Sequence, residues 1–303
     1  LPPSSLRPAV MRVRCAVGMA GGTDFRFPAV CPNMEEGRPH SGAGFHVSAG
    51  LPGWQMTDSA HALRIKQLLR NLAAVPDPHV LERLAHEVLS QRPVELLADF
   101  LCTLGREARE EKVRAIYTAI VRLCIAGLEP DDETRAALYS AVSAQGRGAY
   151  VRYLLPLPPE RTHHDSEVAH DPVLEDMPLG TKKWRARLQD RHILSRLARE
   201  GDVRVMAILL DNPRVIEDDV VTWAARRPLR SEALLAVARH RRWSLRPRVQ
   251  EAVARNPYTP SHIAASYMPV LPSKLLRLIQ QDASLHELVR EAAAENLSLR
   301  EER

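Results

Sequence analysis

An internal repeat in the C-terminal part of the chain limits the possible folds more than any other feature. The segments VMAILLDN (205–212), VQEAVARN (249–256) and VREAAAEN (289–296) each run from Val to Asn, at offsets of 44 and 40 residues. A second element, ILSRLARE (193–200), LLAVARHR (234–241) and LLRLIQQD (275–282), recurs at offsets of 41 and 41. Self-similarity at such a period indicates an array of stacked supersecondary units.

A third element, DVVTWAARRP (219–228) and HIAASYMPVLP (262–272), lies between the other two. We therefore expect each unit to hold three short helices. The composition agrees, because Ala and Leu favour helices and the aromatic residues that favour strands make up only 5% of the chain. The sequence predicts an all-α protein.

Asn-Pro pairs close two of the repeated helices, at Asn212-Pro213 and Asn256-Pro257. Asn tolerates the left-handed conformation at a helix end, and Pro forces the preceding residue into extended geometry. We expect each pair to stop its helix and to fix a corner. The last copy, Asn296-Leu297, has no proline, as expected of a terminal unit.

These residues resemble the bacterial leucine-rich-variant and HEAT-like repeat proteins, most of them uncharacterised, whose short helices end at a corner such as NPYTP (256–260). The resemblance covers residues 179–297 and implies a HEAT/armadillo-like α-solenoid. One leucine-rich-variant branch carries an iron–sulfur cluster on clustered N-terminal cysteines. This chain lacks such cysteines, so no cofactor is expected.

Residues 1–55 hold eight of the 14 glycines and seven of the 23 prolines, a composition that cannot bury much apolar surface. We expect a disordered leader, or a mis-annotated start with translation beginning at Met56. A tryptic peptide wholly within residues 15–38 in a cell lysate would exclude the second alternative. A first helix is expected to follow, capped by Asp58 or Ser59.

An N-terminal helical domain is predicted over residues 56–154, before a Pro-rich linker at 155–180 and the repeat domain at 181–303. Its helices are expected at 79–91, 92–105, 110–127 and 129–146, the last three ending on Gly105, Gly127 and Gly146. The linker contains His163, His164, Asp165, His170 and Asp171. A metal site needs ligands held by rigid elements, so we expect none in this loop.

The four cysteines, Cys15, Cys31, Cys102 and Cys124, show no CxxC spacing. Cys102 and Cys124 fall in apolar helical patterns and are expected to pack as small hydrophobic residues. No apolar run approaches the about 18 residues that cross a bilayer, and no signal-peptide core is present. A cytoplasmic protein is the expectation.

Charge is unevenly distributed, although the net charge is only +5. Residues 56–180 contain 14 basic and 19 acidic residues, whereas residues 181–260 contain 18 basic and nine acidic ones. Such asymmetry marks either a surface for an acidic partner or nucleic acid, or two complementary faces of one fold.

The candidate binding residues are arginines close to two tryptophans in the basic block. They are Trp223, Arg226, Arg227, Arg230, Arg239, Arg241, Arg242, Trp243, Arg246 and Arg248. Aligned on one edge of a stack, they could hold an acidic protein partner or phosphates. Alternatively, Trp223 belongs to the core and the arginines form a solvated face.

Sequence motifs for catalysis, such as GxSxG, HExxH, GxGxxG in a strand–helix context and a Walker A loop, are missing. We therefore expect a non-catalytic interaction scaffold or regulatory adaptor, for example one acting with a small GTPase in bacterial signalling. The alternative is a nucleic-acid-binding HEAT-like protein, possibly similar to DNA glycosylases, with Trp223, Trp243 and Asp219 around an extruded base.

Overall fold

Helices account for the regular structure of the chain wherever it is described. The computed structural model describes residues 55–128, 130–162 and 171–301, with side chains from residue 61 onward. Fifteen α-helices and two short 3₁₀ turns, and no strand, occur within these ranges. The predicted all-α class is confirmed. Except for Gln55, the expected leader lies outside the described residues, as do Cys15 and Cys31. Translation from Met56 stays a prediction.

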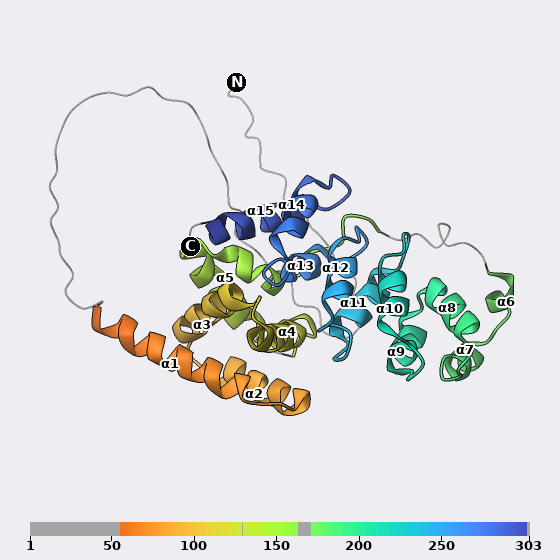
Figure 1. Ribbon diagram of the computed structural model, residues 1–303, viewed down its shortest axis with the longest axis horizontal. Coiled ribbons are helices and arrows are strands. Elements are labelled where there is room, and N and C mark those ends of the chain that lie inside the picture. The colour runs from red at the N-terminus through yellow and green to blue at the C-terminus, as the bar shows by residue number, and fades with distance from the viewer. Residues whose placement is uncertain (1–54, 129, 163–170, 302–303) are drawn as a thin grey trace, which may run out of the picture. The chain divides into compact units, whose positions relative to one another are not determined.

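Five helices form the N-terminal block (Figure 1). They are α1 (Gln55–Ala73), α2 (Pro78–Gln91), α3 (Val94–Glu107), α4 (Glu111–Ile125) and α5 (Asp132–Ala144). The α3 helix packs against α1, α4 and α5, while α2 packs against α4. The carboxylate of Asp77 caps α2 and that of Asp131 caps α5. Helix α1 starts before Asp58, so the predicted cap at Asp58 or Ser59 is wrong.

The three glycines expected at helix ends have two different roles. Gly127 and Gly146 follow α4 and α5 with φ values of 71° and 68°, as predicted. Gly105 instead lies inside α3, which continues to Glu107. A Cβ on Gly105 would lie 2.5 Å from Cγ of Tyr150, so the glycine provides space for an aromatic ring.

The C-terminal helices occur at every position that the repeat predicts. They are α7 (Leu179–Arg185), α8 (Arg191–Glu200), α9 (Val203–Asp211), α10 (Glu217–Ala224), α11 (Ser231–Arg239), α12 (Pro247–Ala254), α13 (Ser261–Ser266), α14 (Ser273–Gln281) and α15 (Glu287–Glu301). Helix α7 packs against α9, α10 against α12, and α13 against α15. We group these helices in threes as three sets, α7–α9, α10–α12 and α13–α15 (Figure 1). In each set the first helix packs against the third.

The Asn-Pro pairs follow the ends of their helices, as expected, and their asparagine side chains make contacts that the sequence did not indicate. Asn212 is extended, with φ −67° and ψ 127°, as its following proline requires. In the described part of the chain, no residue other than glycine has a positive φ. Of the two conformations considered for this asparagine, it therefore adopts the extended one. The side chain is also engaged: Nδ2 of Asn212 donates to the carbonyl oxygens of Ala186 and Leu188, both at 2.8 Å.

Asn256 repeats this arrangement one unit later. Its Nδ2 donates to the carbonyl oxygens of Ala224 and Arg226 at 2.7 and 2.8 Å, and its Oδ1 accepts from the amide of Tyr258 at 3.0 Å. The side chain is 1% exposed. Each carboxamide thus joins the end of the third helix of a set to the end of the first. Asn296 lies inside α15, where Nδ2 donates to Ala292.

Within the predicted linker, residues 155–162 contain no helix, and part of this stretch is bound to the fold. The prediction of an extended segment is wrong for Pro172–Glu175 and for residues 179–180, which are helical. The amide and hydroxyl of Ser261 donate to the carbonyl oxygen of Pro158 at 3.1 and 2.7 Å. The amide of Arg161 donates to Pro257, and Nδ1 of His262 contacts the backbone of Leu157. Residues 157–161 therefore lie along the corner between α12 and α13.

Most of the possible metal ligands in the linker, His163, His164, Asp165 and His170, lie outside the described residues. The fifth, Asp171, caps α6 (Pro172–Glu175) and binds the guanidinium of Arg196. This bond is the main reason why the pKa of Asp171 is lowered. Its carboxylate is therefore part of a structural ion pair.

The two blocks share one buried core within a single unit, Pro52–Arg303. The hydroxyl of Tyr117 in α4 donates to the carbonyl oxygen of Ser266 in α13 at 2.7 Å. The two 3₁₀ turns, η1 (Gly148–Tyr150) and η2 (Arg152–Leu154), pack against α15 and α13 respectively. Cys102 and Cys124 are buried, as predicted, and neither forms a disulfide. Among the described helices, none has the length and apolar character needed to cross a bilayer.

We expect Asn256→Ala to lower the free energy of unfolding by about 2–4 kcal/mol, because two carbonyl groups and one amide lose their partner. Asn256→Gly will be at least as harmful, whereas a left-handed role would let glycine restore stability. Asn296→Ala, which removes one intrahelical bond, is the control and will cost less. Urea unfolding measures all three. Stability retained by the glycine variant would refute the bridging role.

Gly105→Ala is expected to destabilise the protein by about 1–3 kcal/mol through overpacking against Tyr150, although Ala is the better helix former. Gly180→Ala in α7 is the matched control, since a Cβ there meets no atom within 4 Å. The control should be neutral or stabilising by up to about 1 kcal/mol. Thermal unfolding of both variants tests the contrast, and equal shifts in Tm would contradict it.

Candidate partner-binding surface

The two tryptophans of the predicted site lie in the core. Trp223 is 3% and Trp243 is 1% exposed. The indole Nε1 of Trp243 donates to the carbonyl oxygen of Leu210 at the end of α9, at 2.8 Å. The alternative assignment of Trp223 to the core is therefore confirmed. Neither indole can anchor a partner or stack on an extruded base in this fold.

Two of the predicted arginines bind the N-terminal block of the same chain. Nε of Arg239 donates to the last carbonyl oxygen of α4, that of Ile125, at 3.1 Å. Nε of Arg241 donates to Oε2 of Glu82 in α2 at 2.5 Å. For these residues, the basic block complements the acidic one within one fold.

Glu82 also faces a buried arginine that the sequence analysis did not single out. Arg122 in α4 is 4% exposed and lies 3.7 Å from Oε1 of Glu82. Its guanidinium donates to the hydroxyl of Ser244 at 3.2 Å and to the carbonyl oxygen of Arg241 at 3.3 Å. Burial lowers the pKa of Arg122, and the charge of Glu82 opposes that effect. Glu82 thus neutralises two arginines where the blocks meet.

The acidic start of α10 engages three further arginines. Glu217 lies 4.0 Å from Arg246, Asp218 bonds to Arg248, and Asp219 bonds to Arg191 at 2.6 Å. The second carboxylate oxygen of Asp219 accepts from the amide of Ile216 at 3.1 Å. Asp219 therefore caps its helix and holds an ion pair. Both of its oxygens are engaged, which leaves it poorly placed as a catalytic acid.

The remaining predicted arginines, Arg226, Arg227, Arg230 and Arg242, each have a different environment. The guanidinium of Arg242 lies 4.1 Å from the ring centroid of Trp243, an attractive cation–π geometry. Arg226 is half-buried, and burial lowers its pKa. Arg230, also half-buried, occupies the N-cap position of α11. Arg227 is exposed and donates to the carbonyl oxygen of Arg255.

Two adjoining hollows, each of about 440 Å³, contain predicted arginines together with other arginines. Arg227 lines the first hollow, and Arg248 lines both. The first, between α10 and α12, is lined by Val221, Ala225, Arg227, Arg248, Glu251, Ala252, Arg255 and Asn256. The second is lined by Arg106, Glu107, Arg109, Glu110, Arg114, Pro247, Arg248, Gln250, Glu251, Val270, Leu271, Pro272 and Leu275. Because they share Arg248 and Glu251, we treat them as one surface and call it the arginine groove.

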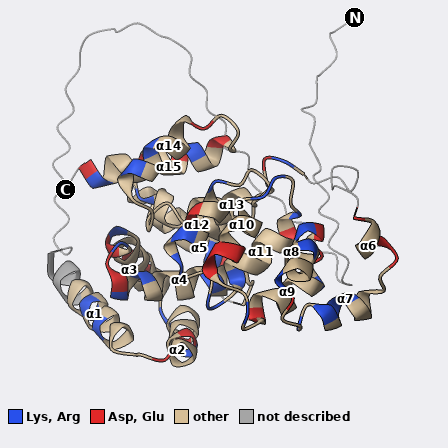
Figure 2. Ribbon diagram, turned by 45° about the vertical axis from the view of Figure 1, so that its right-hand side comes forward, with Lys and Arg blue, Asp and Glu red and all other residues tan. Residues whose placement is uncertain are grey.

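Six arginines and three glutamates line the arginine groove. Arg255 pairs with Glu251 at 3.3 Å and Arg106 with Glu107 at 3.5 Å, and the side chains of both pairs are substantially exposed. Exposed pairs of this kind contribute about 0–1 kcal/mol each, so a carboxylate of a partner can replace the internal one at low cost. The groove is thus a predominantly basic surface in which exposed internal ion pairs can be replaced by ion pairs with a partner. Basic and acidic residues intermingle along the helices that form it (Figure 2).

The sequence analysis missed Arg106, Arg109, Arg114 and Arg255. The first three come from the end of α3, the turn after it and the start of α4, which lie more than a hundred residues before α12 in the chain. The sequence REAREEKVR (106–114) contains the signal, a cluster of charges around a turn. Only the packing of the two blocks brings that cluster to α12.

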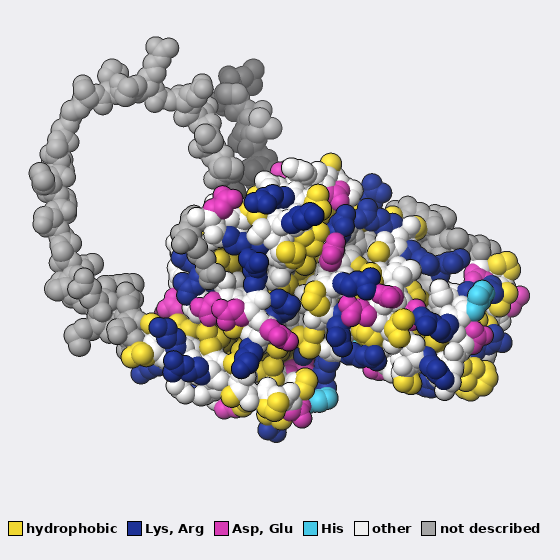
Figure 3. All heavy atoms as spheres, in the orientation of Figure 1, with side chains coloured by type: hydrophobic (Ala, Val, Ile, Leu, Met, Phe, Trp, Pro, Cys, Tyr) yellow, Lys and Arg dark blue, Asp and Glu magenta, His cyan; other side chains and the backbone are white. Residues whose placement is uncertain are grey.

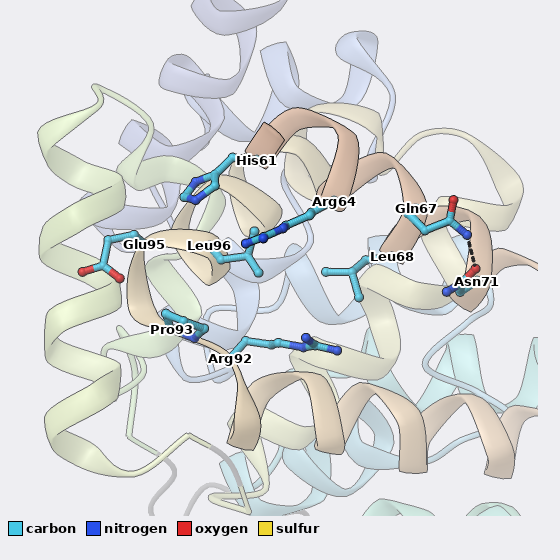
Figure 4. A pocket seen from close by; sticks show the side chains of 9 residues that line it. All are labelled: His61, Arg64, Gln67, Leu68, Asn71, Arg92, Pro93, Glu95 and Leu96. Atoms are coloured by element: carbon cyan, nitrogen blue, oxygen red, sulfur yellow. Dashed lines mark hydrogen bonds between the residues drawn. The ribbon is translucent and has the colours of Figure 1, made fainter. Parts of the chain in front are cut away.

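A larger hollow, of about 700 Å³, lies between α1 and the start of α3 (Figure 4). It is lined by His61, Arg64, Gln67, Leu68, Asn71, Arg92, Pro93, Glu95 and Leu96. The side chains of Arg64 and Arg92 extend across it, and Gln67 donates to Asn71 at 2.8 Å. The lining includes no Ser, Thr or Cys that could act as a nucleophile. The arginine groove remains the better candidate because it contains residues from both blocks.

Within the described ranges, no three His, Cys, Asp or Glu residues are grouped so that they could hold a metal ion. Comparison of the chain with protein-family models, with curated proteins and with solved structures found no match.

Glu82→Gln is expected to lower the free energy of unfolding by about 1–3 kcal/mol, because Arg122 stays buried without a counter-charge. Glu87→Gln, an exposed position on the same helix, is the control and should change little. Arg122→Met in the Glu82→Gln background should restore part of the loss. Urea unfolding of the four-member cycle measures the coupling. Independent, additive effects would show that the pair does not join the blocks.

Proposed function

We propose that the protein is a non-catalytic interaction scaffold that binds an acidic segment of another protein in the arginine groove. The fold behind this proposal is a HEAT/armadillo-like α-solenoid made of helix triplets. It is supported by the recurring pairs α7 with α9, α10 with α12, and α13 with α15. The shared side-chain bridges of Asn212 and Asn256 support it further. Helical stacks of this kind present extended surfaces rather than deep pockets.

The observation that carries the proposal is the convergence of six arginines from both blocks on the arginine groove. Arg227, Arg248 and Arg255 come from one side, and Arg106, Arg109 and Arg114 from the other. Guanidinium groups bind carboxylates in bidentate geometry, and salt bridges with a protein partner are favoured where the guanidiniums are held by rigid elements. An acidic polypeptide fits these groups.

A polypeptide fits the groove better than a nucleic acid does. Three glutamates lie among the arginines, and Glu251 belongs to both hollows. These carboxylates would repel a continuous phosphate backbone, whereas a peptide can place its own basic or neutral residues there. The residues considered for base recognition, Trp223, Trp243 and Asp219, have structural roles instead.

We expect a fluorescein-labelled peptide of alternating Asp, Glu and Ala residues to bind the protein at low salt, measured by fluorescence anisotropy. Arg227→Glu with Arg248→Glu should weaken binding by about tenfold or more, since each tenfold loss corresponds to about 1.4 kcal/mol. Arg70→Glu with Arg204→Glu changes the net charge equally at two exposed positions outside the groove and should have little effect.

A labelled DNA duplex serves as the competing probe in the same assay. Tighter, steeply salt-dependent binding of the duplex, lost in the Arg227→Glu, Arg248→Glu variant, would replace the proposal with nucleic-acid binding. Equal losses for the groove and control variants would refute the groove as the site.

A further inference from the structure

The tryptophan on α7 differs from the two in the core. Trp184 is 57% exposed, and Leu188, one helical turn further along the chain, is 37% exposed. Leu188 follows the end of α7 in a tight turn, in which the amides of Arg187 and Leu188 donate to the carbonyl oxygens of Trp184 and Arg185, both at 3.0 Å. This turn keeps Leu188 next to the end of α7, and we call the two exposed side chains the apolar spot. Trp is enriched among the residues that contribute most to binding at protein interfaces. Trp184 does not belong to the arginine groove.

The position of α7 distinguishes it from its counterparts in the later sets. Helix α10 packs against α8 of the preceding set, and α13 packs against α12 and the turn Arg152–Leu154. The helices on which α7 packs, α8 and α9, both belong to its own set. The ends of helical stacks are normally covered by polar capping units. Figure 3 shows hydrophobic side chains on the surface where Figure 1 places α7.

The charges next to Trp184 are positive. Lys183, Arg185 and Arg187 alternate around it in the sequence. The charge of Lys182 is taken up by Glu200 at 2.6 Å, which leaves that carboxylate engaged inside the fold. The nearest acid in the chain, Asp190, caps α8 by accepting from the amide of His192 at 2.9 Å. The apolar spot is therefore flanked by basic groups whose complement is acidic.

We propose that Trp184 and Leu188 form a second docking surface, which binds an acidic amphipathic helix of a partner protein. The apolar side of the incoming helix covers Trp184 and Leu188, and its carboxylates pair with Lys183, Arg185 and Arg187. This surface is independent of the arginine groove.

Two other occupants agree less well with the observations. A second copy of the chain, joined by a two-fold axis at this surface, would bring Lys183, Arg185 and Arg187 against the same residues. A membrane-bound helix needs a long apolar side, whereas α7 has seven residues and a short apolar spot. An acidic amphipathic helix can cover the apolar spot and also pair with the three basic side chains.

The test is a selection from a displayed library of helix-forming peptides on the full-length protein, with counter-selection on the Trp184→Ala, Leu188→Ala variant. Enriched peptides should combine apolar residues at i, i+3 or i+4 spacing with Asp and Glu. The best peptide, made synthetically, should shift the Trp184 emission to shorter wavelength. The difference from the Trp184→Phe variant isolates that emission.

Affinity of the synthetic peptide should fall about tenfold or more in Trp184→Ala and in Arg185→Glu with Arg187→Glu. Leu278→Ala on α14, which removes another exposed hydrophobic side chain, is the control and should leave the affinity unchanged. Arg227→Glu with Arg248→Glu should also leave it unchanged, so the outcome is separable from that of the arginine groove.

Three results would overturn the proposal. One is enrichment of peptides that are basic, or whose binding does not depend on Trp184. The second is a dimer in sedimentation velocity that Trp184→Ala converts to a monomer, which would assign the surface to a second copy. The third is Trp184-dependent binding to phosphatidylserine vesicles without binding of any selected peptide.

Discussion

The buried carboxamide at the end of the third helix of a set is the interaction on which the C-terminal architecture depends. A helix leaves its last carbonyl groups without intrahelical partners, and burial makes that loss costly. Asn212 and Asn256 each satisfy two such carbonyl groups from a helix more than twenty residues earlier in the chain. One side chain thus ends its own helix and fixes the first helix of the set. Two such bridges lie 44 residues apart in the chain, whereas the third copy, Asn296, bonds within α15.

A second constraint comes from charge. Among the contacts between the acidic and basic blocks, Glu82 lies between the buried Arg122 and the half-exposed Arg241. The cost of burying a guanidinium is offset by a counter-charge and by hydrogen bonds to Ser244 and to a backbone carbonyl. Those arginines are therefore removed from the set available to a partner. Three arginines of the groove, Arg106, Arg248 and Arg255, are held in exposed pairs and remain available for recognition.

The sequence was sufficient for the features that depend on local periodicity and was insufficient for those that depend on distant contacts. Helical spacing predicted the C-terminal helices and the all-α class, and Gly127 and Gly146 end their helices as expected. Gly105 was misassigned because the ring of Tyr150, forty-five positions later, decides its role. Likewise, the burial of Trp243, whose indole bonds to Leu210, and the approach of Arg106 to α12 depend on contacts between distant segments, which no local pattern records.

The way in which residues 157–161 are fixed has a consequence for the order of folding. These residues bond to Pro257, Ser261 and His262, about a hundred positions later, and not to the helices that follow them directly. During synthesis the ribosome releases the connecting segment long before its binding partner exists. Helices α7–α9 must then form while residues 157–161 still lack their hydrogen-bond partners. The hydrogen bonds of residues 157–161 can form only after α13 has been synthesised. Loss of the last fifty residues would therefore remove these bonds from the middle of the chain as well as the C-terminal helices.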